Sequence, residues 1–255
     1  MAGPSRAAET QPGAAGNAEP PVNAGPPVNA GPPVNAGPPV NAGPAPAPSA
    51  RTFAPAPVTL TGSSVRLEPL SLEHHLDPLA SIALDPDLWR WTLNVVQNRD
   101  DLRRYLEEAL REQAEGRSVP FATIHLATGR AAGCTRFGNI ETRHRRVEIG
   151  WTWIGRDYQR TRVNTEAKLL MLEHAFETWG CHRVELKTNV LNQRSRNAML
   201  RIGAKEEGIL RKHALNDQGV PRDTVYYSVI DDEWPMVKAR LHAMLAEHRE
   251  PKEGT

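Results

Sequence analysis

The chain has 255 residues, and its 31 Lys and Arg residues nearly balance its 30 Asp and Glu residues. This balance argues against a broad basic surface for nucleic acid, and no stretch approaches the ~20 apolar residues that span a bilayer. Two cysteines are too few for a disulfide framework, and the histidines form no zinc-binding motif, so no metal is expected. Because the N-terminus lacks the pattern of a secretory signal, we expect a cytoplasmic protein with no membrane partner.

Residues 1–57 differ in composition from the rest of the chain. They hold 15 of the 22 prolines and four tandem copies of the hexapeptide PPVNAG, at residues 20–43. Proline removes backbone donors, glycine resists ordering, and each repeat offers one valine for burial. Such a segment cannot offset its ordering entropy by burying apolar surface. We predict a disordered arm over 1–57, either a spacer or a docking segment for a proline-recognising partner, and one folded domain over 58–250.

The folded part alternates between strand and helix patterns. Strands are predicted at 65–70, 119–127, 131–141, 147–154, 183–188, 207–215 and 224–230. Helices are predicted at 72–83, 99–115, 164–179, 192–202 and 232–248. The first strands follow one another as antiparallel neighbours, and residues 147–188 form a strand–helix–strand unit. These patterns indicate a mixed α/β domain.

The segment 148–164, EIGWTWIGRDYQRTRVN, carries the first chemical signal. A strand ends, a short polar loop follows, and an apolar helix begins at about Asn164. A helix N-terminus presents unpaired N–H groups that bind phosphate, and Arg160 and Arg162 would add charge-assisted contacts. Since many α/β folds turn in this way, the segment alone indicates a phosphate site only weakly.

A second segment, NVLNQRSRNAMLRIGAKEEGILR at 189–211, follows the next strand. Together the two segments resemble the GNAT N-acetyltransferase superfamily over about residues 58–248, and within it the ribosomal-protein N-terminal acetyltransferase branch. The segment Asn192-x-x-Ser195 and the tail DEWP at 232–235 match that branch. The resemblance implies a GNAT-like, mostly antiparallel central sheet flanked by helices. It also implies acetyl-CoA as co-substrate and direct acetyl transfer to an amine acceptor.

The resemblance assigns the coenzyme loop residue by residue. The family's loop, Gln/Arg-x-x-Gly-x-Gly/Ala, is matched by Gln159, Arg160, Thr161, Arg162, Val163 and Asn164. Two glycines of the pattern are replaced here by Arg162 and Asn164, which changes how closely the backbone can approach a pyrophosphate. Arg162 could contribute its guanidinium instead, and Asn164 could cap the helix.

Glu148 is the candidate general base for the acceptor amine. It lies 11 residues before Gln159, the separation seen in the histone-acetylating branch. Strand periodicity predicts that Glu148 shares a face with Gly150 and Thr152, opposite the Trp151 and Trp153 rings. The alternative is a surface glutamate paired with Arg145 or Arg146.

Other roles follow from the resemblance. A backbone N–H of Trp153 or Ile154 would donate to the thioester oxygen. Ser195 would protonate the leaving thiolate, with Tyr226 and Tyr227 as competitors on the last strand. The remaining candidates are Asn192 and, more weakly, Asn189, which would bind the pantetheine amides.

The acceptor stays open, as a protein N-terminus or a small-molecule amine. Trp89 and Trp91 flank Arg90 and would either line a substrate pocket or pack in the core. Homodimers are common among the relatives, so a homodimer is left open. The alternative function is a non-catalytic acyl-CoA-binding regulatory module, because both loop glycines are lost. A third hypothesis is a binder of nucleotide phosphates.

Overall fold

The computed structural model describes residues 53–247. Residues 1–52 of the predicted arm, including all four repeats, lie outside the described residues. The Phe53 ring packs against Trp179, with ring centroids 6.1 Å apart, and Val58 also contacts the core. The chain therefore contacts the domain from Phe53 onward, before the predicted start at residue 58.

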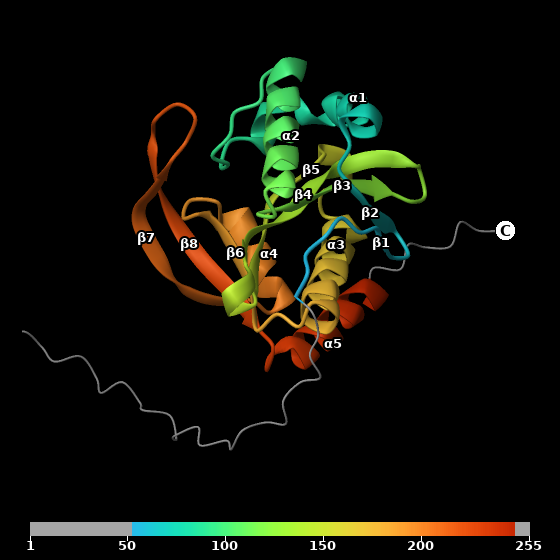
Figure 1. Ribbon diagram of the computed structural model, residues 1–255, viewed down its shortest axis with the longest axis vertical. Helices are drawn as coiled ribbons and strands as arrows, with labels where there is room; N and C mark the ends of the chain where they lie inside the picture. Colours follow the sequence, from blue (N-terminus) through green and yellow to red (C-terminus); the bar gives the residue numbers. More distant parts are fainter. Residues whose placement is uncertain (1–52, 248–255) are drawn as a thin grey trace, which may run out of the picture. The chain divides into compact units, whose positions relative to one another are not determined.

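Eight strands form one sheet in the order β1-β2-β3-β4-β5-β6-β8-β7 (Figure 1). All neighbouring pairs are antiparallel except β5 and β6, which run parallel around the α3 crossover. The strands are β1 (Leu60–Thr61), β2 (Val65–Pro69), β3 (Val119–His125), β4 (Arg130–Glu141), β5 (Arg146–Ile154), β6 (Arg183–Asn189), β7 (Lys205–Leu215) and β8 (Pro221–Ile230). The predicted mixed, mostly antiparallel sheet is confirmed; the two-residue β1 is not among the predicted strands.

Helices cover both faces of this sheet and enclose two apolar cores. The helices are α1 (Leu72–Ala83), α2 (Arg99–Ala114), α3 (Arg162–Glu173), α4 (Gln193–Ile202) and α5 (Trp234–Glu247). The α1 and α2 side chains pack with Trp153 on one face, because Leu102 and Leu106 of α2 repeat at helical spacing and are fully buried. Helices α3, α4 and α5 bury their apolar side chains on the other face.

The β7–β8 hairpin is long, and its tip docks on the loop between α1 and α2. The Asp217 N–H donates to the Leu93 carbonyl, and the Val95 N–H donates to Asp217 Oδ2, each at 2.9 Å. Residues 122 positions apart in the sequence are therefore joined, which fixes one wall of the site described below.

Candidate active site

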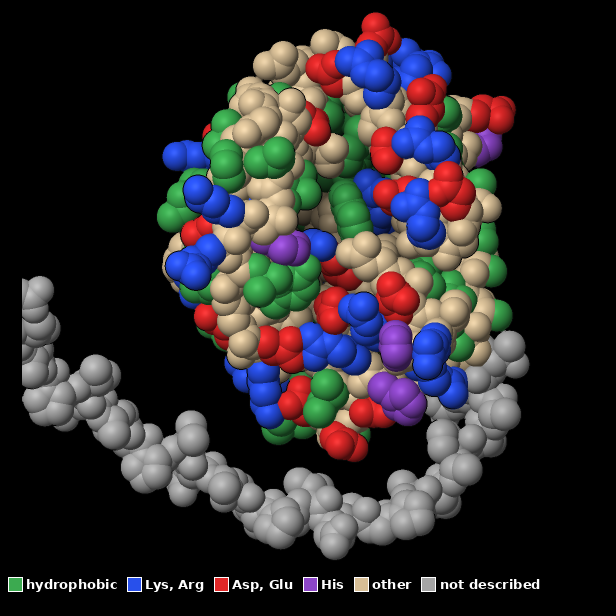
Figure 2. Space-filling model, turned by 60° about the vertical axis from the view of Figure 1, so that its left-hand side comes forward, with side chains coloured by type: hydrophobic (Ala, Val, Ile, Leu, Met, Phe, Trp, Pro, Cys, Tyr) green, Lys and Arg blue, Asp and Glu red, His purple; other side chains and the backbone are tan. Residues whose placement is uncertain are grey.

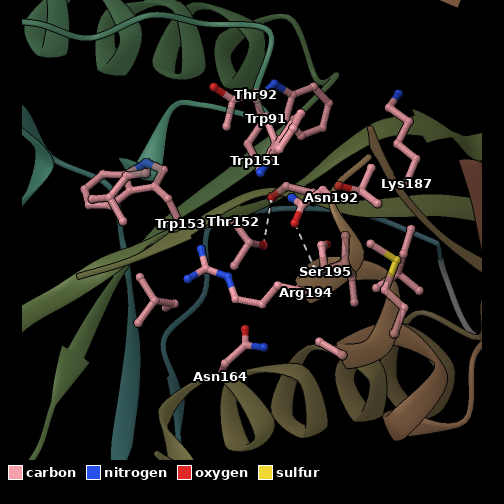
Figure 3. A pocket seen from close by; sticks show the side chains of 18 of the residues that line it. Trp91, Thr92, Trp151, Thr152, Trp153, Asn164, Lys187, Asn192, Arg194 and Ser195 are labelled. Atoms are coloured by element: carbon pink, nitrogen blue, oxygen red, sulfur yellow. Dashed lines mark hydrogen bonds between the residues drawn. The ribbon is translucent and has the colours of Figure 1, made fainter. Parts of the chain in front are cut away.

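The site is a wedge between β5 and β6. These parallel strands pair only from Arg146–Glu148 to Arg183–Glu185, and beyond this the two strands separate. The separation leaves a cavity of about 650 Å³, which we call the wedge cavity, lined by β5, β6, the start of α3, α4 and the loop after α1. Figure 3 shows its labelled side chains converging from these elements, and Figure 2 shows the surface hollowed beside the β7–β8 hairpin.

A bulge in β5 sets which side chains face each side of the sheet. Arg136 pairs with Gly150 and Cys134 with Trp153, so Trp151 and Thr152 together stand opposite Thr135. Trp151 has a left-handed backbone, with φ 49°.

The bulge corrects one prediction about the faces of β5. Glu148 pairs with Gly138, and the Trp151 ring lies against Gly138, so Trp151 shares the face of Glu148. Trp153 belongs to the apolar cluster against which Trp151 packs, so it also lies on this face and not on the predicted opposite one. Thr152 accepts a 2.9 Å hydrogen bond from Lys168 of α3 and therefore lies on the opposite face. Strict alternation fails here because one extra residue reverses the side-chain direction.

Glu148 is buried, with 2% of its surface exposed. Its Oε2 accepts a 2.6 Å hydrogen bond from Asn139 Nδ2 and lies 2.8 Å from Lys187 Nζ. Neither predicted partner, Arg145 nor Arg146, forms this ion pair. Gly150 leaves room for the carboxylate, since a Cβ there would lie 2.6 Å from Glu148 Oε1. The surface-glutamate alternative is therefore wrong.

One backbone donor of β5 points into the wedge. The Gly155 N–H donates to the Ala132 carbonyl at 2.8 Å, next to the pairs Ile154–Gly133 and Trp153–Cys134. Antiparallel alternation then directs the Trp153 N–H to β4 and the Ile154 N–H and C=O away from it. Gln159 Nε2 donates to the Ile154 carbonyl at 2.8 Å, which agrees with this direction.

Helix α3 begins at Arg162, two residues before the predicted start. The Thr161 hydroxyl caps it by accepting from the Val163 N–H at 3.3 Å, so Asn164 is not the cap. Arg160 just before the cap adopts the left-handed region, with φ 63°. The free N–H groups of the first turn thus face the end of the wedge cavity, beside Asn164.

The side chains at the two replaced glycine positions point in different directions. Arg162 Nη2 lies 3.4 Å from Ser63 Oγ, outside the cavity wall, so its guanidinium does not fill the loop. Asn164 points from α3 into the cavity (Figure 3), and its buried Oδ1 has no hydrogen-bond partner among the described residues. Val163 is buried in the core and leaves only its backbone for binding.

The structure divides the remaining candidates. Asn192 caps α4, because its Oδ1 accepts from the Ser195 N–H at 3.1 Å, and both residues line the cavity. Asn189 instead accepts from the Leu191 N–H in a turn, outside the cavity wall. Tyr226 also lies outside that wall, with its hydroxyl 3.5 Å from His213 Nε2. Tyr227 is fully buried and donates to Glu206.

Both tryptophans after α1 line the wedge cavity, and Trp89 is also part of the core. Trp89 is 4% exposed and packs against Tyr105 and Trp153 at centroid distances of 5.2 and 5.6 Å. Trp91 is half-buried, and its ring points toward the wedge cavity together with Trp151 (Figure 3). Core packing is thus confirmed for Trp89, and both tryptophans line the wedge cavity.

The comparisons with known proteins decide the family. A family model described as an acetyltransferase (GNAT) domain matches residues 64–205. The chain belongs to the GNAT family. A GCN5-related N-acetyltransferase structure from Brucella melitensis is 30% identical with TM-score 0.72, and the match covers 79% of this chain and 91% of that chain.

One curated relative bears on the branch, and one further solved structure shares the fold. The Bacillus subtilis (strain 168) protein named "Putative ribosomal N-acetyltransferase YdaF" is 34% identical over 43% of this chain and 58% of that protein. This chain covers only 50–64% of the length of the curated relatives that it matches. Mycobacterium smegmatis RimJ, solved in complex with CoA-disulfide, shares the fold at 23% identity and TM-score 0.64, over 75% of this chain and 96% of that chain. The predicted resemblance to the ribosomal-protein branch of the GNAT superfamily is confirmed.

Sequence reasoning missed five basic residues that line this cavity, and three of them lie on α3 and α4. Arg194 Nη1 donates to Gln159 Oε1 at 2.7 Å, and Arg201 Nη2 lies 3.4 Å from Thr165 Oγ1, so these two arginines of α4 reach the α3 N-terminus. Their spacing of seven residues places them on one helix face, which was the available signal. Lys168 of α3 lines the cavity; burial lowers the pKa of Lys168 to about 7, and the Glu148 carboxylate opposes this shift.

Two properties of the described residues bear on other classes of function. Between residues 53 and 247 no helix is long and apolar enough to cross a membrane. In the same range, His, Cys, Asp and Glu side chains form no group of three that could hold a metal ion.

Proposed function

We propose that the chain transfers the acetyl group of acetyl-CoA to a primary amine, either a protein N-terminus or a small-molecule amine. The observation that carries this proposal is the wedge between β5 and β6. It places a buried carboxylate, Glu148, and an outward-facing donor, the Ile154 N–H, on the wall of one cavity that ends at the α3 N-terminus.

The residues present fit the coenzyme. The first-turn N–H groups of α3 would hold the pyrophosphate, with Arg160 and Arg194 as charge-assisted partners. Asn164 Oδ1, which has no partner among residues 53–247, and the amide nitrogen of Asn192 remain available for the pantetheine amides. Acetyl-CoA would supply the activated acetyl thioester.

The chain's own groups then serve the transfer. Glu148 would take the proton of the acceptor ammonium through Oε1, since Asn139 and Lys187 occupy Oε2. This matters because an amine near pKa 10.4 is neutral about once in a thousand molecules at neutral pH, whereas an α-amine near 8 is far less protonated. The Ile154 N–H would donate to the oxygen where negative charge develops. Ser195 would protonate the departing thiolate.

The regulatory alternative rests on the two missing loop glycines. The position of Arg162 beside Ser63 removes a steric objection to coenzyme binding, and buried Glu148 has no evident role in a module that only binds. Catalysis is therefore the reading that accounts for both ends of the cavity.

The test is an acceptor screen with the full chain, in which free thiol is measured for a panel of amines and peptides. Acetyl-CoA should raise the melting temperature, and Glu148→Gln should lower turnover about 10²-fold or more. Glu107→Gln, on the exposed face of α2, is the matched control. A folded, acetyl-CoA-binding protein that releases no thiol with any acceptor would favour the regulatory module.

A further inference from the structure

The part of the wedge cavity on the α2 side of the sheet is where an acceptor would enter under the proposed function. We call it the acceptor chamber. Its walls include Trp91, Tyr105, Glu148, Trp151, Lys187 and Arg222. Figure 3 shows Trp91, Trp151 and Lys187 on one side of the cavity, with Arg194 and Asn164 on the opposite side.

Arg222 faces this chamber from β8. Tyr226 pairs with Lys187 across β6 and β8, and Arg222 lies four residues before Tyr226, so strand alternation places all three on one face. Arg222 Nη1 donates to the Trp91 carbonyl at 2.9 Å, and Nε donates to Thr224 Oγ1 at 3.3 Å. These two contacts fix the guanidinium at the chamber wall.

The Arg222 guanidinium has no counter-ion among residues 53–247. Glu148 is the carboxylate of the chamber, and Lys187 already pairs with it at 2.8 Å. Burial lowers the pKa of Arg222, and the Glu148 carboxylate and Tyr226 oppose this shift. The chamber therefore carries one uncompensated positive charge.

The charges of the chamber also act on a neighbouring histidine. His213 of β7 contacts Tyr226, and its pKa is lowered by burial and then by the charges of Lys187 and Arg222, with Glu148 opposing. Two cations thus act on a side chain at the edge of the chamber. A plain ammonium would enter this field at an electrostatic cost, and a carboxylate on the same molecule would remove that cost.

We infer that the acceptor is an amine that also carries a carboxylate, and that Arg222 binds this carboxylate while the amine lies at Glu148. The inference rests on the proposed function, because that function is what places the acceptor amine at Glu148. Trp91 and Trp151 would enclose the carbon chain between the two charged groups. The carboxylate could belong to a free amino acid or to an acidic residue near a peptide N-terminus, and the two sources are separated below.

The experiment compares acceptor pairs that differ only in the anion. One arm uses free amino acids and their carboxamides, and the other uses short amidated peptides that carry Asp or Asn at the second position. Binding is measured by tryptophan fluorescence without coenzyme, and transfer is measured as kcat and KM by thiol release. We expect the carboxylate member of at least one arm to bind about tenfold more tightly.

Substitutions of Arg222 test whether this residue causes the preference for the carboxylate. Arg222→Met should raise KM for the carboxylate member and should not raise KM for the member that lacks the carboxylate, because removing the guanidinium also removes its repulsion of the ammonium. Arg222→Gln keeps an N–H donor for the Trp91 carbonyl and should lose the preference while keeping the melting temperature. Arg211→Met, at an exposed position of β7, is the matched control.

The inference would be overturned if the unmodified chain bound and acetylated the carboxylate member and the other member equally well in both arms. An equal loss for both members in Arg222→Gln would also overturn it, because it would mark a purely structural role. If no acceptor releases thiol but fluorescence still shows Arg222-dependent carboxylate binding, the proposed function fails while the anion site stands.

Discussion

Asn139 donates from its side-chain amide to Oε2 of Glu148 at 2.6 Å, and it does so from a left-handed backbone with φ 46°. The register of β4 and β5 shifts at this point, between Gly138 and Glu141. Asparagine is among the few residues that tolerate this backbone region. The bend in β4 thus directs an amide at the buried carboxylate.

Removing this amide should lower turnover without unfolding the chain. Asn139→Gly keeps a residue suited to positive φ, so we expect stability within about 1 kcal/mol of the unmodified chain and kcat reduced about tenfold, since Glu148 loses one of its two orienting partners. Asn139→Ala adds backbone strain and should be less stable than Asn139→Gly. Steady-state kinetics and thermal melts check both variants; unchanged kcat in Asn139→Gly would contradict a positioning role.

We expect Ser195, and not Tyr226, to donate the proton to the leaving thiolate. Ser195 lines the wedge cavity and Tyr226 does not. We expect Ser195→Ala to lower kcat about tenfold, and Tyr226→Phe to leave kcat within about twofold. The measurement is kcat at saturating acetyl-CoA with one acceptor; a larger loss in Tyr226→Phe than in Ser195→Ala would reverse this assignment.

Glu166 ties α3 to the turn between β1 and β2. Its carboxylate accepts hydrogen bonds from the N–H groups of Ser63, Ser64 and Val65 and from the Ser63 hydroxyl, at 2.6–2.9 Å. Burial alone would raise the pKa of Glu166, but these hydrogen bonds outweigh it and hold the pKa below the ordinary 4.5. The stabilisation is therefore present above pH 4.5 and lost as the pH falls through the lower folded value.

Glu166→Gln should lower the free energy of unfolding by about 2–4 kcal/mol at pH 7 and should make stability less sensitive to acid. Urea unfolding at pH 7 and at pH 3 checks this. Glu108→Gln, on the exposed face of α2, is the control. Equal losses at both pH values would show that the charge of Glu166 is not what the turn binds.

Lys168 should make the free energy of unfolding depend on pH in the neutral to alkaline range, whereas Glu166 acts in the acidic range. Its pKa falls from 10.5 to about 7 in the folded chain, because burial disfavours the ammonium and the Glu148 charge only partly opposes this. Between these values the unfolded chain binds more protons, so stability rises with pH, by at most about 1.4 kcal/mol per pH unit.

Lys168→Met should flatten this rise and increase stability at neutral pH. Urea unfolding between pH 7 and 10 measures the slope, with Lys205→Met at an exposed position as control. A variant with the same slope as the unmodified chain would show that Lys168 stays charged when buried.

The sequence predicts most elements of this fold because local signals coincide with them. Helix α1 runs from Leu72 to Ala83 as expected, since the Ser71 cap and the apolar spacing agree. Glycine at 203 ends α4 with φ 101°, which also follows from residue type.

The parts that could not be predicted depend on tertiary contacts. A left-handed backbone at Trp151 has no sequence signal, so the direction of Thr152 could not be foreseen. Arg162 reaches Ser63, 99 residues away, and Arg222 reaches Trp91, 131 residues away. Chain-local patterns place these residues on elements but cannot choose their long-range partners.

The three-residue seam between β5 and β6 has a mechanical consequence. The strands before residue 155 and those after residue 182 form two leaves that share only the pairs at 146–148 and 183–185. Beyond this seam, the leaves are joined by the helix layer on the α3 side and by the tip of the β7–β8 hairpin, which is docked on the loop between α1 and α2. A molecule bound between the leaves would contact both and restrain their relative motion. Amide hydrogen exchange at 186–189 and at 152–154 should therefore slow together when it binds.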